Sequence, residues 1–456
     1  MACGTPSSPY RVGTGDFFKH WARTFVSAGD AEREALLGCM RRDAREEDRP
    51  DFPFNAGVAL RELEQRALAA GVFEVGLEFP WSRAGSLFEL ACIALQDNEP
   101  ERAVDILRRM ASEGPLTAYQ HQEFAHRLIL VGLLDEADEH LESALALEPE
   151  RLRECLAYRQ LAEYMSEYPL EVALARSERL LAAYRFHTAE DIVAEVACRL
   201  EEKRPYSLIR LNDGEGSLLH LGVADEARWH PLYWRSRREF HVTYWFGDDS
   251  RMLDPEWLRI AREFNAAVNN ADCLAGYMPS GLQLVYESGS VRNVPGCFNV
   301  VRKLEALAEQ ARGGQTSAVL ADSLVNQEMR RSGALARLIG SQRRIALVTW
   351  NPALPDAMAE HFGLSEVVFH QTTGEARTVP GSETKNHAEA HRQLSEALSE
   401  AEPGLLYLVG GGIPGKVYCD VIKRAGGVAL DIGGVVDVWM DTSKHQHEDL
   451  TGQRLV

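Results

Sequence analysis

Apolar and polar positions follow two different patterns along the chain, and the change between them comes near residue 200. From about residue 56 to 200, apolar residues recur every three or four positions, which is typical of amphipathic helices, and strand-like runs are few. Beyond that point, short apolar runs rich in β-branched and aromatic residues alternate with helix-period segments. The pattern therefore predicts an all-helical region followed by a domain of alternating strands and helices.

One segment of the helical region repeats after 34 residues. Residues 96–115, QDNEPERAVDILRRMASEGP, align with residues 130–149, LVGLLDEADEHLESALALEP. The aligned pairs are Ala103 and Ala137, Leu107 and Leu141, Met110 and Ala144, and Pro115 and Pro149. A looser copy centres on Ala173, at a shift of 36 residues. The period resembles that of tetratricopeptide repeats, whose stacked helix pairs commonly hold peptides or partner chains. The alternative is an ordinary helical bundle.

Eight short apolar runs in the C-terminal part predict strands. They are residues 206–211, 240–246, 272–277, 316–321, 344–350, 366–371, 404–410 and 427–433. Continuous apolar strands that alternate with helices indicate an α/β, mostly parallel sheet with both faces covered. The patterns together predict an N-terminal helical or irregular segment (1–55), a tetratricopeptide-like repeat domain (56–184) and an α/β domain (185–456). Ligands of such domains bind at the carboxyl ends of the strands.

The first strand end that carries chemistry reads LIRLNDGEGSLL, residues 208–219. Asp213 and Glu215 are separated by Gly214, and side chains spaced in this way point in the same direction in a strand or tight turn. The two carboxylates can therefore share one hard divalent cation, and Mn²⁺ or Mg²⁺ would keep open positions for substrate phosphates. The alternative is structural, with Asp213 capping the next helix and Glu215 in its first turn.

The second strand end reads LYLVGGGIPGKVYCDVIKRAGG, residues 406–427. A strand runs into three glycines that include Gly411 and Gly412, then into Gly415 and Lys416, and a helix follows. Backbone N–H groups of such a loop and the helix N-terminus form an anion site, to which Lys416 would add charge. The spacing fits neither a Walker A loop nor GxGxxG, and the alternative is a turn that packs the strand on the helix.

A third strand end and two loops supply further candidates. Asp431 belongs to the run 427–433 and lies within or just past its apolar strand, where a carboxylate is costly unless it is hydrogen-bonded or serves a ligand. Asp248 follows the aromatic run 240–246, and His387 opens a helix-period segment. Each has a structural alternative, which for Asp248 is a helix cap.

The overall charge limits the classes of partner. The chain has 68 Asp and Glu residues against 49 Lys and Arg residues, which gives a net charge of −19 and argues against nucleic acid as a partner. Its eight cysteines are scattered without CxxC or zinc-like spacing, so we interpret them as reduced thiols of a cytoplasmic protein. No run is long and apolar enough to suggest a signal peptide or a membrane span.

With these three strand ends identified, residues 185–440 resemble the GT-D glycosyltransferases, a bacterial group of sugar-nucleotide transferases with a Rossmann-like fold and a DxE metal motif. The family pattern is an apolar strand followed by Arg-Phe-Gly-Asp-Gly-Glu, and residues 210–215 of this chain read RLNDGE. Leu211 and Asn212 depart from the pattern. The family's late Gly-Pro loop and closing Asp-x-Gly are similar to residues 412–415 (GIPG) and 431–433 (DIG), although Ile413 is inserted.

The resemblance implies a metal-dependent glycosyltransferase. Asp213 and Glu215 would hold Mn²⁺ or Mg²⁺ against the diphosphate of a nucleotide sugar, with a UDP-sugar as the favoured donor. Residues around the two loops would shape the donor site or contact phosphate, and they are Arg210, Asn212, Gly214, Gly411, Gly412, Gly415 and Lys416. Asp248, Asp431 and His387 are candidates for the base that activates the acceptor hydroxyl.

The repeats and the departures from the family pattern leave several functions open. The repeats suit a protein or peptide acceptor, but they also suit assembly into a homo-oligomer that extends a cell-surface glycan. Asn212 and Ile413 keep a non-catalytic alternative, a repeat scaffold with a degenerate nucleotide-sugar-binding domain. A nucleotide-dependent oxidoreductase is the least favoured class, because the chain lacks GxGxxG.

Overall fold

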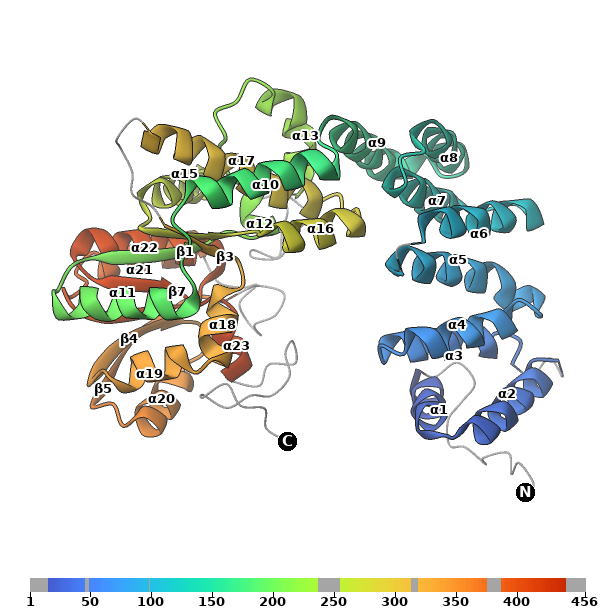
Figure 1. Cartoon of the computed structure of the whole chain (residues 1–456), viewed down its shortest axis with the longest axis horizontal. Helices are drawn as coiled ribbons and strands as arrows, with labels where there is room; N and C mark the ends of the chain where they lie inside the picture. Colours follow the sequence, from blue (N-terminus) through green and yellow to red (C-terminus); the bar gives the residue numbers. More distant parts are fainter. Residues whose placement is uncertain are drawn as a thin grey trace. The chain divides into compact units, whose positions relative to one another are not determined.

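The computed structural model describes residues 15–45, 49–97, 99–236, 255–312, 319–374 and 387–439 (Figure 1). The chain divides into two compact units, Met1–Tyr158 and Arg159–Val456. In the described residues the first unit is all helical, and the second is built on a seven-stranded parallel sheet. None of the described helices combines the length and the apolar character that are needed to cross a membrane.

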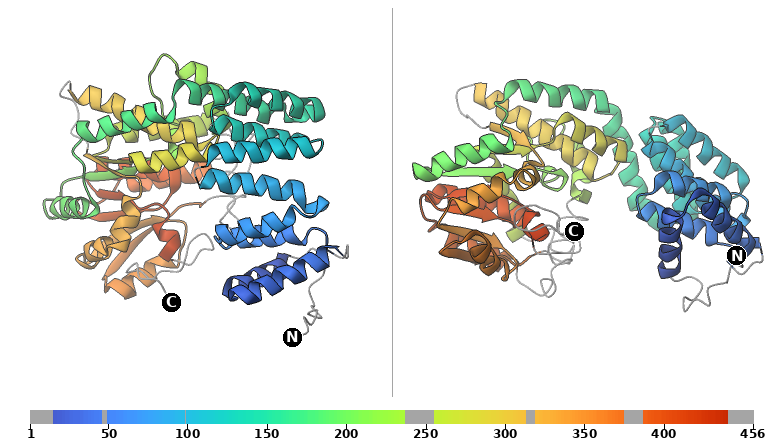
Figure 2. Two further views of the ribbon diagram at one scale, coloured as in Figure 1. Left: turned by 45° about the vertical axis from the view of Figure 1, so that its right-hand side comes forward. Right: turned by 60° about the horizontal axis from the view of Figure 1, so that its bottom comes forward.

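Helices of the first unit pack as consecutive hairpins, α3 on α4, α5 on α6 and α7 on α8. Successive hairpins contact each other through α4 and α5 and through α6 and α7, and Figure 2 shows the helices stacked in layers. The elements are α1 (Gly15–Ser27), α2 (Asp30–Arg45), α3 (Phe52–Glu62), α4 (Arg66–Gly76), α5 (Pro80–Gln96), α6 (Pro100–Glu113), α7 (Ala118–Leu130) and α8 (Leu134–Leu147). After a short 3-10 turn, α9 (Leu152–Glu167) runs from the first unit into the second.

Buried positions of these hairpins recur every 34 residues. The recurring sets are Ala56, Leu90 and Phe124 in the first helices, and Ala69, Ala103 and Ala137 with Phe73, Leu107 and Leu141 in the second helices. The period predicted from residues 96–149 therefore begins one hairpin earlier, in α3 and α4. The sequence comparison did not detect that copy because, apart from Ala69, its equivalent buried positions hold other residue types. Gly57, for example, lets α3 approach α4 so closely that an added Cβ would lie 2.4 Å from a ring carbon of Phe73.

The second unit contains a seven-stranded sheet in which all pairs are parallel, in the order β3-β2-β1-β7-β6-β4-β5. Its strands are β1 (Tyr206–Arg210), β2 (Cys273–Gly276), β3 (Val319–Asp322), β4 (Arg344–Thr349), β5 (Glu366–Gln371), β6 (Leu406–Val409) and β7 (Val428–Asp431). Seven of the eight predicted strands are confirmed, and the eighth, 240–246, lies outside the described residues. The predicted α/β, mostly parallel class is therefore confirmed for this unit.

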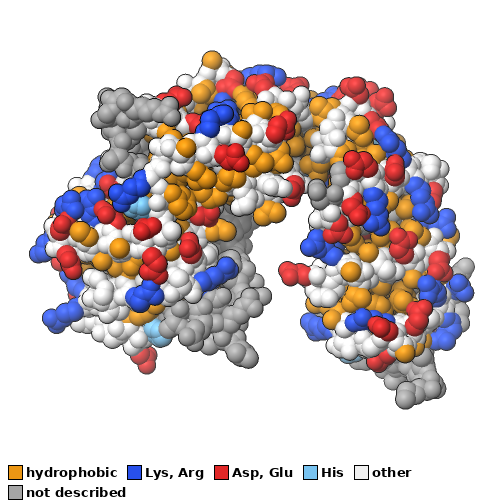
Figure 3. Space-filling view, in the orientation of Figure 1, with side chains coloured by type: hydrophobic (Ala, Val, Ile, Leu, Met, Phe, Trp, Pro, Cys, Tyr) orange, Lys and Arg blue, Asp and Glu red, His pale blue; other side chains and the backbone are white. Residues whose placement is uncertain are grey.

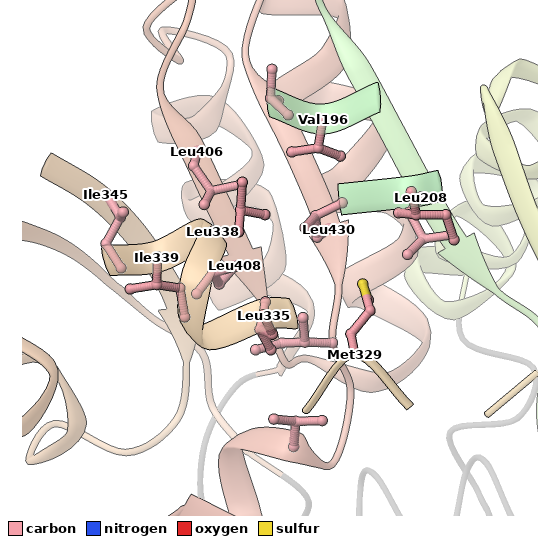
Figure 4. Close-up of a cluster of buried hydrophobic side chains, with 14 of the residues drawn as sticks. Val196, Leu208, Met329, Leu335, Leu338, Ile339, Ile345, Leu406, Leu408 and Leu430 are labelled. Atoms are coloured by element: carbon pink, nitrogen blue, oxygen red, sulfur yellow. The ribbon is translucent and has the colours of Figure 1, made fainter. Parts of the chain in front are cut away.

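Helices cover both faces of the sheet. One face packs against α11 (Ala189–Glu201), α18 (Val325–Arg331), α19 (Ala334–Gly340), α20 (Leu354–Phe362) and α23 (Val435–Trp439). Figure 4 shows this core, where side chains such as Val196 and Leu338 meet Leu208, Leu408 and Leu430 of the strands. The elements α15 (Pro255–Asn270), α21 (His387–Leu398) and α22 (Gly412–Ala425) pack together, with α22 against β1, β6 and β7. Apolar residues that alternate along β6 and β7 supply both cores, which explains their continuous burial.

The division between the units falls at residues 158/159, earlier than the 184/185 boundary expected from the sequence. The looser repeat copy around Ala173 forms α10 (Leu170–Ala183), which packs on α16 (Pro279–Ser288) and α17 (Asn293–Arg312) of the second unit. The Arg176 guanidinium pairs with Glu305, and the Tyr184 hydroxyl donates to the Leu304 carbonyl. The helical pattern of α9 and α10 continues that of the repeats, so the sequence alone could not show which unit they join.

Figure 3 shows Lys and Arg side chains interspersed with Asp and Glu side chains over much of the viewed surface, with hydrophobic side chains gathered over α10 and α16. Exposed apolar residues of these helices include Val172, Leu181 and Leu284. The interspersed charges give the described part of this face no uniform basic surface, as the acidic composition predicts.

The sheet order places a topological switch point between β6 and β4. The chain leaves β6 toward β7 on one side, and it leaves the neighbouring β4 toward β5 on the other. Ligands of open α/β sheets bind in the crevice outside the strand ends at such a point. The glycines that follow β6 begin at this position.

Candidate active site

Side chains from three strand ends meet in the second unit. Lys416 of α22 places its ammonium nitrogen 2.7 Å from Glu215 Oε1 and 3.2 Å from Asp431 Oδ2. Glu215 lies in α12 (Asp213–Gly216), directly after β1, and Asp431 is the last residue of β7. All three residues are buried, with exposed fractions of 9% or less. We call Glu215, Lys416 and Asp431 the carboxylate–lysine cluster.

Parallel pairing brings these residues together from distant parts of the sequence. Leu208 of β1 and Leu408 of β6 both pair with Leu430 of β7, so the three strands end side by side. Because α22 packs across all three strands, its first turns lie over their carboxyl ends. The sequence predicted Lys416 next to a phosphate, but the structure directs its ammonium group to the two carboxylates.

Lys416 is a buried cation held by two anions. Burial disfavours its charge, but the attraction of Asp431 and Glu215 outweighs that cost and raises the pKa of Lys416 above its ordinary value. Lys416 is therefore charged at neutral pH. Removing one member of a buried ion pair typically costs about 3–5 kcal/mol, because the other charge is left uncompensated.

Arg210 joins the cluster to the opposite face of the sheet. Its backbone N–H donates to Asp431 Oδ2 over 3.2 Å, and its Nε donates to the Ser323 carbonyl over 3.1 Å. The guanidinium lies against Gly433, where an added Cβ would be 2.2 Å from Nη1. Gly433 also has φ of +51°, in the left-handed region that favours glycine. The closing Asp-x-Gly of the sequence thus packs around the end of β1.

The short helix α12 orients Glu215. The backbone N–H of Asn212 donates to Glu215 Oε2 over 3.2 Å, while the other oxygen of Glu215 binds Lys416. Glu215 therefore lies in the first turn of the helix, as the structural alternative predicted, but the N-cap is Asn212 and not Asp213. A Cβ at Gly216 would lie 1.7 Å from the Gly296 carbonyl oxygen, and the glycine therefore lets α12 press against α17. Asp213 begins α12, and its side chain lies outside the described residues.

The glycine loop after β6 packs closely against neighbouring residues, and it leads into α22. A Cβ at Gly410 would lie 2.7 Å from Val436, and one at Gly411 would lie 3.3 Å from the Cα of Gly415. Gly412, the first residue of α22, has φ of +56°. These contacts favour the structural alternative for the glycines, and the loop still presents the N-terminus of a 14-residue helix at the switch point.

A pocket lies beside the loop, and the sequence did not predict it as a unit. It has room for about 20 Å³, roughly one water molecule, and its walls comprise Trp257, Ile260, Thr372, Thr373, His387, His391, Gly411, Pro414 and Tyr418. We call it the α21–α22 pocket. Because Lys416 and Tyr418 are two residues apart on one helix, their side chains project to roughly opposite sides of α22. The pocket and the carboxylate–lysine cluster therefore flank the same helix start.

His387 and His391 line this pocket from α21. His387 accepts or donates at Nδ1 toward the Thr373 hydroxyl over 2.9 Å. His391 lies 3.1 Å from the Tyr418 hydroxyl through Nδ1 and 3.0 Å from Glu263 through Nε2. Of the residues in these contacts only His387 was a sequence candidate, because Thr373, Tyr418 and Glu263 come from separate segments without a motif. The i, i+4 spacing of the two histidines on a predicted helix was the one available signal.

One sequence candidate for the acceptor base, Asp248, lies outside the described residues. Within the ranges that the structure describes, no group of three or more His, Cys, Asp or Glu side chains is arranged to hold a metal ion. Mg²⁺ and Mn²⁺ sites completed by substrate phosphates, however, need only one or two carboxylates from the protein.

Comparison with known proteins gives no family assignment. No protein-family model matches the chain, and no curated protein matches it. The similarity to GT-D glycosyltransferases therefore rests on the residues of the three strand ends, and function has to be argued from the site.

Proposed function

We propose that the second unit is a glycosyltransferase that moves a sugar from a nucleotide-sugar donor, such as a UDP-sugar, to an acceptor hydroxyl. The observation that carries this proposal is the convergence of Glu215, Lys416 and Asp431 beside the N-terminus of α22. A buried charged cluster next to an anion-binding helix start, at the carboxyl ends of a parallel sheet, suits a ligand that carries phosphate. The order of the three motifs is also that of the GT-D pattern.

In this proposal the diphosphate binds at the start of α22. The backbone N–H groups of the first turn and the positive end of the helix dipole favour negative charge there. The glycines of the loop allow close approach of the backbone, and Gly412 supplies the left-handed conformation that begins the helix. Lys416 acts by holding Glu215 and Asp431 in place, since its own charge is paired with them.

The donor set at β1 suits a divalent cation. Glu215 offers carboxylate oxygens, which Mg²⁺ and Mn²⁺ prefer, and its Oε1 already binds a positive charge, the ammonium of Lys416. Asp213 and Glu215 would therefore hold the ion. When bound, it would offset the charge that develops on the leaving diphosphate.

Geometry distinguishes the candidates for the acceptor base. Asp431 Oδ2 accepts the backbone N–H of Arg210 and contacts Lys416, so we assign it a positioning role. His387 lies in the α21–α22 pocket, next to Gly411, where an acceptor hydroxyl near the donor would lie. Its imidazole is the group that we propose takes the proton, with Thr373 fixing the ring through Nδ1.

We also propose that the first unit presents the acceptor. Its hairpins recur with the 34-residue period of tetratricopeptide-like repeats, and such stacks commonly bind peptides or partner chains. A protein or peptide acceptor follows from this proposal.

Thermal stability in the presence of nucleotides tests the donor site directly. The full chain and Asp213→Ala are melted with a panel of nucleoside diphosphates and nucleotide sugars, with and without Mn²⁺. A ligand at about 100 times its dissociation constant should add about 2.7 kcal/mol to the free energy of unfolding. We expect a Mn²⁺-dependent stabilisation with one class of nucleotide, reduced in Asp213→Ala. If no nucleotide stabilises the full chain, the transferase proposal is wrong.

A further inference from the structure

A cation already lies at the carboxylate that the proposed metal site needs. Lys416 Nζ contacts Glu215 Oε1 and Asp431 Oδ2, and the lysine is only 3% exposed. The second oxygen of Glu215 accepts the backbone N–H of Asn212, so both oxygens are engaged within the chain. We propose that Lys416 is a counter-cation that keeps Glu215 from holding a bare divalent ion, so that Mn²⁺ or Mg²⁺ enters the site only together with an anionic diphosphate.

The charge balance of the buried residues carries this inference, which rests on the proposed function because it concerns the same site. Glu215 and Asp431 contribute two negative charges, and Lys416 contributes one positive charge. The guanidinium of Arg210 contributes a second positive charge, because it and Asp431 both lie against Gly433. A divalent ion would bring two more positive charges into a site of low dielectric, and the carboxylate of Asp213, which the proposed function also assigns to the ion, would offset only one of them. A diphosphate brings the missing negative charge.

The small number of carboxylates near Glu215 also favours entry of the divalent ion together with a diphosphate. Over the described ranges, no three His, Cys, Asp or Glu side chains gather where they could hold an ion by themselves. A divalent ion at Glu215 therefore needs other oxygen ligands to complete its coordination, and the phosphates of a donor bound at the N-terminus of α22 can supply them. Lys416 and the first turn of α22 belong to one helix, so the counter-cation lies next to the proposed phosphate position.

Direct measurement of metal binding tests the role of Lys416. The full chain, Lys416→Met and the double variant Lys416→Met/Asp431→Asn are titrated with Mn²⁺, and free Mn²⁺ is measured by electron paramagnetic resonance with and without UDP. Methionine keeps much of the length of lysine without its charge. We expect wild type to bind Mn²⁺ weakly alone and more tightly with UDP. Lys416→Met should bind bare Mn²⁺ more tightly by about tenfold or more, because one buried negative charge is no longer balanced.

The double variant is the matched control. It loses one positive and one negative charge, so its affinity for bare Mn²⁺ should return close to that of wild type. Adding Glu215→Gln to Lys416→Met should abolish the gain, since it removes the carboxylate that binds the ion. Thermal melts of the same proteins cover the case of a destabilised Lys416→Met, because Mn²⁺ alone should then raise its melting temperature and leave wild type unchanged.

The outcomes separate this inference from the proposed function. If Lys416→Met binds bare Mn²⁺ no more tightly than wild type, the counter-cation role is wrong, even if wild type binds Mn²⁺ with UDP. If wild type binds no UDP with Mn²⁺ but Lys416→Met gains affinity for bare Mn²⁺, Lys416 has the inferred role and the UDP-sugar donor is wrong.

Discussion

At the scale of single residues, the carboxylate–lysine cluster depends on the close fit of neighbouring side chains as well as on its charges. Asp431 can accept the backbone N–H of Arg210 only because β1 and β7 end side by side. The Arg210 side chain then fills the space above Gly433, which has no Cβ to obstruct it. A glycine two residues after a buried aspartate is therefore a structural requirement of the site as well as part of a motif.

Replacing Gly433 with alanine should destabilise the second unit. The new Cβ would meet Arg210 Nη1, and the residue would keep an unfavourable φ of +51°. We expect the free energy of unfolding to fall by about 1–3 kcal/mol, measured by urea denaturation followed by circular dichroism. Gly340→Ala is the control, because nothing lies within 4 Å of its Cβ position. Equal losses in the two variants would contradict the proposed packing of Arg210.

At the scale of elements, the α7–α8 hairpin shows how polar residues are accommodated in the repeats. Thr117 and Gln120 form a capping box that begins α7. Between the helices, Nδ1 of His121 lies 2.7 Å from Nδ1 of His140, and the His140 ring packs on Phe124. One imidazole must donate and the other accept, so this contact requires at least one neutral ring.

Acidification should weaken this hairpin. Burial and, to a smaller extent, His121 lower the pKa of His140 to about 4 against the opposing effect of Glu136, and burial also lowers the pKa of His121. At acidic pH the unfolded chain therefore binds more protons than the folded chain. The contribution of the two histidines to the free energy of unfolding is fully present above the ordinary histidine pKa of 6.5, and it is lost as the pH falls toward 4. After allowance for solvent screening we expect a loss of roughly 1–2 kcal/mol.

Thermal melts of the full chain between pH 7 and pH 5 measure this loss, and a narrow range limits the contribution of carboxylates. His140→Gln keeps a polar side chain without a group that titrates in this range. Its melting temperature should depend less on pH than that of wild type. A variant with the same pH dependence would show that the histidine pair does not carry the effect.

At the scale of the whole molecule, α10 and the C-terminal part of α9 belong to the second unit and not to the repeats of the first. Tyr164 of α9 packs edge-on against Trp229 and Phe298, and Tyr168 also contacts Phe298. Arg176 and Tyr184 of α10 bind α17. These contacts make the end of the helical region a part of the second unit's core.

Two fragments test this boundary. Residues 159–456 should fold as a unit, whereas residues 185–456 should be less stable because they lose the C-terminal part of α9 and all of α10 and expose the faces of α16 and α17. We expect the shorter fragment to melt at least about 5 °C lower, measured by circular dichroism. Equal melting temperatures would show that α9 and α10 add nothing to the second unit.

The sequence by itself determined the elements and their approximate order. Hydrophobic periodicity depends on local geometry, so the repeat helices and seven described strands could be predicted from residues close to one another. The rule that ligands bind at strand ends also directed attention to Glu215, Lys416 and Asp431 before their contacts were known. The sequence could not show that a single lysine links the two carboxylates.

Only the tertiary structure decided which residues meet. Strand order is not encoded in any one strand, and the order β1-β7-β6 brings Glu215, Asp431 and Lys416 together across more than 200 residues of sequence. The same packing gathers Trp257, Thr373 and Tyr418 around His387, although no spacing relates them. Local periodicity sets each element, but burial of apolar faces against distant partners sets the arrangement, and the charges at the strand ends are paired by that arrangement.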